Sequence, residues 1–184
     1  MVQAIKVSRI IEVPDDVEVH LEGKKVIVKG SKGTLTRDFS KEPVSIELIE
    51  GGKKVHVWAN WPRRRESALV GTIAAHIKNM IVGVQKGFTY KLKIVFSHFP
   101  ISVKVQDKVV LIENFVGERA PRKARIVGDV KVKVSGDDVI VQGIDLEAVS
   151  QTAANIEQAT KIRNKDPRVF LDGIYLYERS EGMD

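Results

Sequence analysis

The chain of 184 residues, of which 43% are hydrophobic, is long enough for one large domain or two small ones with real cores. Thirty lysines and arginines against 24 acidic residues give a net charge of +6, which mildly favours an anionic partner. The absence of cysteine excludes disulfides, thiol catalysis and cysteine-based metal sites.

No apolar run approaches the roughly 18 residues that a membrane span needs, and the first residues lack the apolar core of a signal peptide. We therefore expect a cytoplasmic protein with no membrane attachment. Basic residues are spread over both halves and form no tail, so any surface that binds an anion must be a folded one.

The first half opens with apolar residues that alternate with polar ones on both sides of glycine turns, which is typical of β-hairpins with one buried face. Hairpins are predicted over 17–28 and 44–57, with a further strand over 34–39. From Glu66 to Val82 the apolar residues follow a helical stripe instead, which predicts a helix. A strand over 88–96 follows the helix.

The second half repeats this order of elements. Its predicted strands cover 101–105, 109–116, 130–134 and 139–141. A basic loop, residues 117–125, separates the second of these strands from the third. A helix is predicted from about Asp145 to Ile162, and a closing strand runs from Gly173 to Glu178.

Three pairs of segments match between the halves: Ile46–Val57 with Val132–Val141, Gly71–Ile77 with Ser150–Ile156, and Gly87–Tyr90 with Gly173–Leu176. We interpret the match as an internal duplication, with chance similarity among β-rich segments as the alternative. The predicted fold is α+β, with two tandem similar domains, each an antiparallel β-sheet covered on one face by an α-helix. The domains are residues 1–82 and 83–184. The second copy carries seven additional residues between its helix and its last strand.

Nothing in the sequence has the pattern of a catalytic or metal site. The four histidines show no metal-ligand spacing, and the acidic pairs Asp15-Asp16 and Asp137-Asp138 fit turns rather than a cleft. The segment Gly30-Ser31-Lys32-Gly33 lacks the glycine spacing of a phosphate-binding loop, and a strand pattern follows it. We therefore expect no enzyme, no cofactor, no metal and no small-molecule substrate.

Three clusters of basic residues remain, each at the end of a predicted element. One charged loop is usually solvated surface, but three such clusters fit contact with a phosphate backbone better. The main candidates lie in the basic loop and in the loop after the second helix, where Pro167 prevents the helix from continuing. They are Arg119, Arg122, Lys123, Arg125, Lys161, Arg163, Asn164, Lys165 and Arg168. The secondary candidates are Arg63, Arg64, Arg65 and Lys86.

The aromatic motif of base-stacking sheets is missing from the sequence. Recognition of a folded RNA by its shape and phosphates is therefore the better fit, rather than recognition of a single strand through stacked bases.

Segments along the whole chain resemble one family. They are Val28–Leu35, Asn79–Val84, Gly87–Lys91, His98–Ile101, Val149–Ile156, Asn164–Asp166, Arg168 and Phe170–Tyr175. They resemble ribosomal protein L6 of the large subunit, in the archaeal and eukaryotic branch of that family. The resemblance implies two similar α+β domains, of which the second docks on the large-subunit (23S) rRNA near the base of the acidic stalk and the translation-factor site. It also implies neighbouring large-subunit proteins as partners, and neither catalytic activity nor a cofactor.

By family position, the loops Asn164–Arg168 and Arg119–Arg125 are expected to make the main rRNA contacts. The match at Arg119–Arg125 rests on position and charge rather than on identical residues. The alternative hypothesis is a non-ribosomal module that binds an acidic protein partner through its duplicated sheets.

Overall fold

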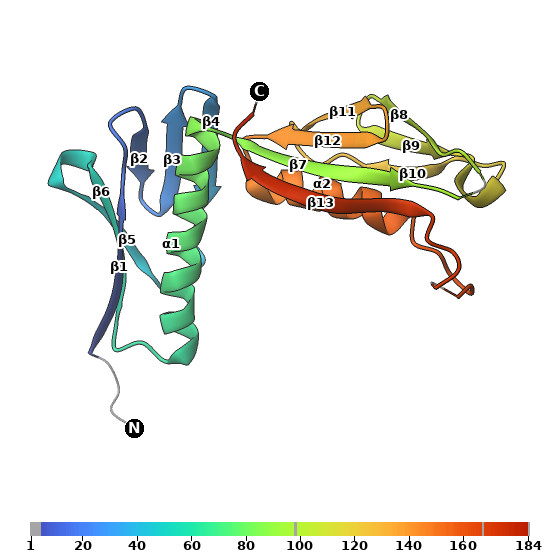
Figure 1. The fold of residues 1–184 in the computed structure, drawn as a ribbon. Helices are drawn as coiled ribbons and strands as arrows, with labels where there is room; N and C mark the ends of the chain where they lie inside the picture. The colour runs from blue at the N-terminus through green and yellow to red at the C-terminus, as the bar shows by residue number, and fades with distance from the viewer. Residues whose placement is uncertain (1–4, 98, 167, 184) are drawn as a thin grey trace. The chain divides into compact units, whose positions relative to one another are not determined.

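The long helix α1 (Arg64–Gln85) closes the first of two units in the computed structural model, which describes residues 5–97, 99–166 and 168–183 (Figure 1). Unit 1 is Met1–Lys86 and unit 2 is Gly87–Asp184. The sequence predicts a boundary after residue 82, whereas the helix continues to Gln85 before the chain turns. The turn is made at Gly87, whose φ of 78° is the left-handed conformation that commonly ends helices.

Unit 1 contains two three-stranded antiparallel sheets that both pack against α1. The strand order is β1–β6–β5 in one sheet and β2–β3–β4 in the other. The strands are β1 (Lys6–Glu12), β2 (Glu18–Glu22), β3 (Lys25–Gly30), β4 (Gly33–Asp38), β5 (Ser45–Ile49) and β6 (Lys54–Asn60), with a short 3-10 turn η1 (Glu50–Gly52) before β6.

The core of unit 1 forms where the alternating apolar residues of the strands meet the apolar stripe of the helix. Val26 and Val28 of β3 and Val55 and Val57 of β6 are fully buried, because alternate residues of a strand point to the same face. The apolar stripe of α1 covers them, with Ile77 fully buried. By length and composition α1 could also cross a membrane, but this stripe is the core of a folded unit.

Unit 2 repeats the plan with one strand more. Its sheets have the orders β10–β9–β8 and β11–β12–β7–β13, and α2 packs against both. The elements are β7 (Phe88–Val95), β8 (Ser102–Gln106), β9 (Val109–Glu113), η2 (Phe115–Gly117), β10 (Arg122–Arg125), β11 (Lys131–Ser135), β12 (Asp138–Gly143), α2 (Leu146–Ala159) and β13 (Gly173–Glu181). The predicted α+β class and tandem arrangement are confirmed.

Three predicted boundaries in unit 2 are wrong. Strand β9 ends at Glu113, because Asn114, just before η2, and Val116 within it take left-handed conformations. The second half of the expected basic loop is strand β10, which pairs with β9. Helix α2 ends at Ala159 rather than near Ile162, since the next two amides bond three residues back and tighten the last turn.

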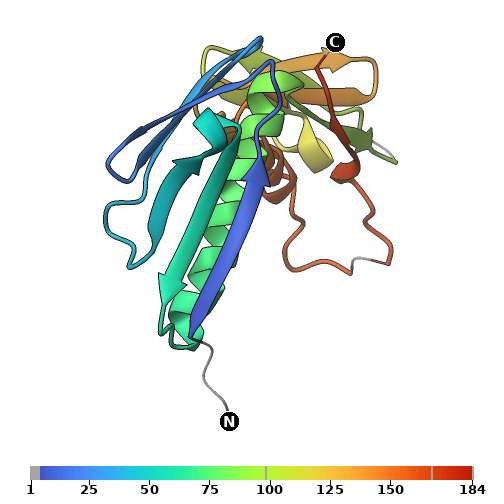
Figure 2. The same cartoon turned by 90° about the vertical axis from the view of Figure 1, so that its left-hand side faces the viewer.

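The two units differ at one edge of the sheet that contains β6 in unit 1 and β12 in unit 2. In unit 2, β7 pairs with β12 on one side and with β13 on the other. The strand in the same place in unit 1 is β1, which among the described residues pairs only with β6. Figure 2 shows β1 beside β6, with α1 behind both. No strand is predicted over Lys6–Glu12 from the sequence, because no turn signal or strict alternation marks this segment.

Candidate nucleic-acid interface

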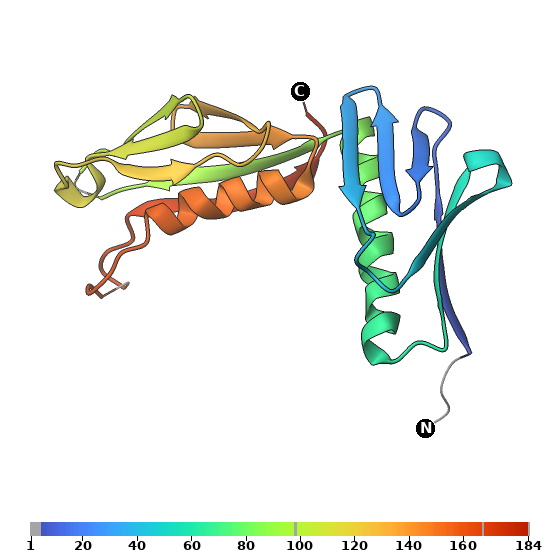
Figure 3. The ribbon, with the colours of Figure 1, turned by 180° about the vertical axis from the view of Figure 1, so that it is seen from behind.

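The loop between α2 and β13, residues 160–172, is held at both ends by buried hydrogen bonds. Thr160 is 3% exposed; its hydroxyl donates to the Glu157 carbonyl at 3.0 Å and accepts from the Ile174 amide at 3.0 Å. At the other end, buried Asp172 accepts from the Ser97 amide at 3.0 Å. Figure 3 shows this loop leaving the end of α2, beyond the sheets. Its basic side chains are therefore carried by a loop with fixed ends.

A turn organised by Asp166 shapes the tip of this loop. The Asp166 carboxylate accepts from the Arg168 amide at 2.9 Å, and its carbonyl accepts from the amides of Val169 and Phe170 at 3.1 and 3.0 Å. Asn164 has a φ of 59°, a left-handed conformation that asparagine tolerates. Pro167, which the sequence analysis uses to end the helix, lies outside the described residues, as does His98.

Arg122 joins the two main basic clusters. Its guanidinium makes a two-pronged ion pair with Glu118, with Nη2–Oε1 at 2.6 Å and Nε–Oε2 at 2.9 Å. Nη1 donates to the carbonyls of Ala159 at 2.9 Å and Lys161 at 3.1 Å. A cation at these carbonyls satisfies the free acceptors at the end of α2 and favours the helix dipole. Arg122 thus ties β10 to the start of the 160–172 loop.

The protein's own packing holds this contact in place. The Arg122 guanidinium also lies 4.3 Å from the centre of the Phe115 ring, and Phe115 is 1% exposed. The hydrogen bond from Arg122 holds the pKa of the Glu118 carboxyl below its usual range; burial opposes this shift, and the charges of Arg122 and Lys165 add to it. The influence of Lys165 shows that the 160–172 loop lies near the basic loop.

The other predicted residues of β10 point away from the contact made by Arg122. Lys123 and Arg125 are exposed, whereas Ala124 between them is buried, as strand alternation requires. The Arg125 carbonyl accepts from the Asn155 side chain at 2.9 Å, which fixes the strand against α2. Lys123 and Arg125 therefore present their cations on the outer face of the sheet.

The remaining main candidates are exposed. Arg119, Lys161, Arg163, Asn164, Lys165 and Arg168 all lie on the surface. Within the described ranges the side chains of Arg163 and Arg168 make no hydrogen bond or ion pair, and Lys165 Nζ lies 4.5 Å from the centre of the Phe170 ring. Sequence reasoning missed Val169 and Leu171, which are 67% and 55% exposed on the same loop, because a pattern of apolar residues does not show which of them stay uncovered.

The secondary candidates lie at the two ends of one helix. Arg63 caps the start of α1 without a side-chain hydrogen bond, and Arg64 and Arg65 begin the helix. Cations are unfavourable there, because the helix dipole is positive at that end. Lys86 follows the far end, about 33 Å away at 1.5 Å per residue. The structure therefore does not bring these four residues into one site.

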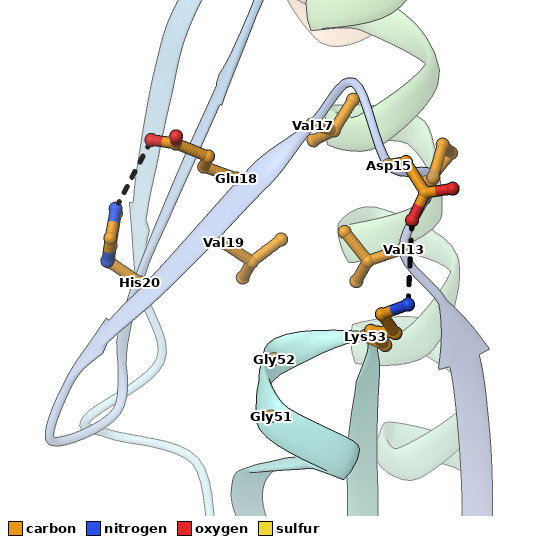
Figure 4. Close-up of a pocket in the computed structure, with 10 residues that line it drawn as sticks. Val13, Asp15, Val17, Glu18, Val19, His20, Gly51, Gly52 and Lys53 are labelled. Atoms are coloured by element: carbon orange, nitrogen blue, oxygen red, sulfur yellow. Dashed lines mark ion pairs between the residues drawn. The ribbon is translucent and has the colours of Figure 1, made fainter.

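The residues around the hollow in Figure 4 do not form a catalytic set. Figure 4 shows a hollow in unit 1 of about 390 Å³ with Val13, Val17 and Val19 in its lining. Its charged residues pair locally, Lys53 with Asp15 at 3.8 Å and His20 with Glu18 at 3.7 Å. No cluster of three or more possible metal ligands occurs in the described part of the chain.

The family model of ribosomal protein L6 matches the chain twice, over residues 13–87 and 99–173. The chain belongs to the ribosomal protein L6 family. The two matches also confirm the predicted duplication, and membership of a family of structural ribosomal proteins confirms that the chain is not an enzyme.

Curated relatives cover nearly the whole chain. A "Large ribosomal subunit protein uL6" of Ignicoccus hospitalis is 57% identical over 182 residues, which are 97% of this chain and 98% of the relative. A protein with the same name from Desulfurococcus amylolyticus is 52% identical, over 100% of this chain and 100% of the relative. One from Staphylothermus marinus is 53% identical, over 98% of this chain and 99% of the relative. The relatives are mostly archaeal, which confirms the predicted family and branch.

Proposed function

We propose that the chain is a structural constituent of the large ribosomal subunit and binds large-subunit rRNA mainly through unit 2. The name shared by its relatives supports the ribosomal role. The 160–172 loop carries the RNA-binding part of the proposal, because its fixed ends hold exposed Arg163 and Arg168 with little ordering cost. The resemblance of the sequence further suggests a position near the base of the acidic stalk and the translation-factor site, beside other large-subunit proteins, in the cytoplasm.

The candidates take different roles in this proposal. Arg163, Asn164, Lys165 and Arg168 contact phosphates or base edges, and Val169 and Leu171 provide apolar contact beside them. Lys123 and Arg125 extend the cationic surface along β10, with Arg119 and Lys161 next to them. Arg122 is a positioning residue, because Glu118 and two carbonyls already occupy its donors. Arg63, Arg64, Arg65 and Lys86 make secondary contacts in unit 1.

A salt series tests the electrostatic part of the proposal. If about six phosphates are neutralised, the logarithm of the affinity for a large-subunit rRNA fragment falls with the logarithm of salt concentration with a slope of about −5. Filter binding of the purified chain over a range of potassium chloride concentrations measures this slope. An affinity that does not change with salt contradicts phosphate binding.

A pair of matched variants tests the position of the site. Arg163→Ala with Arg168→Ala should weaken rRNA binding by several kcal/mol, at about 1.5–3 kcal/mol for each charge-assisted hydrogen bond. The control is Lys131→Ala with Lys133→Ala, which removes the same charge from exposed positions on β11. Equal losses in the two double variants would show a general charge effect and no site at the loop.

Nuclease treatment distinguishes RNA binding from the alternative function, binding of an acidic protein. An absorbance ratio at 260 and 280 nm that falls on nuclease treatment of the purified protein supports RNA as the partner. A protein partner that survives nuclease, with no RNA in the preparation, supports the alternative.

A further inference from the structure

The outer edge of β1 presents unpaired backbone groups. The Trp61 amide donates to the Ile5 carbonyl and the Val13 amide to the Lys53 carbonyl, both at 2.9 Å, so the odd-numbered residues of β1 bond to β6. In an antiparallel pair the intervening residues then point their N–H and C=O groups the other way. These residues are Lys6, Ser8, Ile10 and Glu12, and no strand among the described residues pairs with them on that side.

Unit 2 shows what such an edge binds. In the registers of the two sheets, Arg9 opposite Val57 corresponds to Tyr90 opposite Val141, so β7 is the counterpart of β1. Strand β13 covers the outer edge of β7. The strand that follows α1 in the chain cannot do the same for β1, because it is β7 itself and is paired on both sides within unit 2.

The helix beside the edge of β1 differs from its counterpart in charge at the position that contacts the covering strand. In unit 2 the Glu157 carboxylate of α2 accepts from the amide of Leu176 in the covering strand at 3.4 Å. The duplication aligns Glu157 with Lys78 of α1, which is exposed. Around Lys78, the same side of α1 carries only small exposed residues, Gly71 and Ala75, and this leaves room for the side chains of an added strand.

The charges beside this edge select the chemistry of the partner. Side chains alternate along β1, so Arg9 lies on the same helix-facing side as buried Ile11, yet it is exposed at the edge. Neither Arg9 nor Lys78 has a charged partner in the described part of the chain. On the other face Ile10 is 57% exposed and offers an apolar contact.

We propose that the outer edge of β1 binds an extended segment of a partner protein, which adds as an antiparallel strand with a carboxylate on its helix-facing side, beside Arg9 and Lys78. Backbone hydrogen bonds supply the affinity in this mode of recognition, and the alternate side chains supply the specificity. A second copy of this chain fits poorly in the register of complete overlap, because antiparallel pairing of Lys6–Glu12 with itself then places Arg9 opposite Arg9. The two cations thus repel a second copy and admit an acidic strand.

Titration of the RNA-free full chain with a synthetic peptide tests the proposal. The peptide has the length of β1, and threonines on one face alternate with valine, glutamate and valine on the other. Amide chemical shifts in NMR spectra should change at Ser8, Ile10 and Glu12 and on α1 near Lys78. Shift changes confined to other regions, or none at millimolar peptide, contradict the proposal.

Two sets of variants make the result specific. Ser8→Pro removes an amide that points away from β6 and should weaken peptide binding about tenfold without disturbing the β1–β6 pair. Arg9→Glu with Lys78→Glu should abolish binding of the glutamate peptide and create binding of a lysine peptide of the same pattern. The partner does not bind as proposed if Ser8→Pro leaves peptide binding unchanged, or if the charge exchange has no effect. If Ser8→Pro fails to fold, the charge exchange alone decides the outcome.

The outcome is independent of the RNA proposal. The peptide experiment contains no RNA and reads residues of unit 1, whereas the salt series measures rRNA binding by the whole chain and the Arg163 and Arg168 variants test unit 2. A chain that fails to bind rRNA could still bind the peptide, and the reverse also holds.

Discussion

Units 1 and 2 are built on one plan but use it differently. Both place a helix against two antiparallel sheets. In both, a side chain of the helix at the same aligned position contacts a neighbouring strand. In unit 1, His76 of α1 contacts Arg37 of β4 at 3.3 Å; in unit 2, the aligned Asn155 of α2 bonds to the Arg125 carbonyl of β10. Unit 2 then adds β13 and the 160–172 loop. The core is thus alike in the two units, whereas the sheet edges and the connections differ.

The largest expected effect comes from the aligned core residues Ile77 and Ile156, both fully buried. Replacing either by alanine should lower the free energy of unfolding of its unit by about 2–5 kcal/mol, through lost burial and a cavity. Both tryptophans, Trp58 and Trp61, lie in unit 1, so their fluorescence reports that unit alone. Ile77→Ala should shift the tryptophan transition in urea, and Ile156→Ala should shift only the tyrosine signal of unit 2. A tryptophan transition that moves equally in both variants would show that the units unfold together.

The contact made by Arg122 has no counterpart described in unit 1. Arg122→Ala should destabilise the end of α2 and the 160–172 loop by about 1–3 kcal/mol, because two carbonyls and Glu118 lose their charged donor. Hydrogen exchange of the amides near Lys161 and Ile174 measures the local loss, and rRNA affinity should fall with it.

Arg122→Lys is the control for this variant. Lysine keeps the charge but cannot form the two-pronged pair, so it should recover only part of the protection. Full recovery would show that charge alone is sufficient at this position.

The starts of the two helices give a smaller contrast. Asp145 caps α2 by accepting from the Glu147 amide at 3.0 Å, whereas Arg63 precedes α1 without a cap. Arg63→Asp should therefore stabilise unit 1 by about 1 kcal/mol, measured by tryptophan fluorescence in urea. The same variant should weaken rRNA binding if Arg63 makes a secondary contact. A destabilised unit 1 would contradict the view that the arginines are unfavourable there for folding.

The smallest effect concerns pH. The folded-state pKa of Glu118 is lowered, so its ionised form stabilises unit 2 above the unfolded value of 4.5, and this contribution is lost as pH falls through the lower folded value. Because the pair is partly exposed, the contribution should be below about 1 kcal/mol. Unfolding of the wild type and of Glu118→Gln, followed by tyrosine fluorescence from pH 7 to pH 3, measures it. The two should differ at neutral pH and converge in acid; a constant difference would remove Glu118 as the source.

Much of this architecture can be predicted from the sequence, because it depends on the local periodicity of apolar residues. Val26, Val28, Val55 and Val57 alternate, and Ile73 and Ile77 fall on one helical stripe, so the hairpins, the helices and the duplication follow from the pattern. The basic clusters are also visible as composition.

What the sequence does not show depends on partners that are distant along the chain. The residues of β1 become a strand because β6 pairs with them, and Arg122 turns inward because the end of α2 meets it. The sequence therefore marks Arg122 as one more cation in a basic loop, and only the three-dimensional structure separates it from the exposed Lys123.

The double pairing of β7 also bears on the order in which the protein folds during synthesis. All the strand partners of unit 1 have been made by Asn60, and its helix by Gln85. Strand β7 is made next, yet its pairing with β13 joins Phe88 to Glu181 and must wait for nearly all the remaining chain. Its outer edge is therefore unprotected on the nascent chain for that time, as sequence-distant pairings are the slow ones to form. Elongation rate should matter for unit 2 and hardly at all for unit 1.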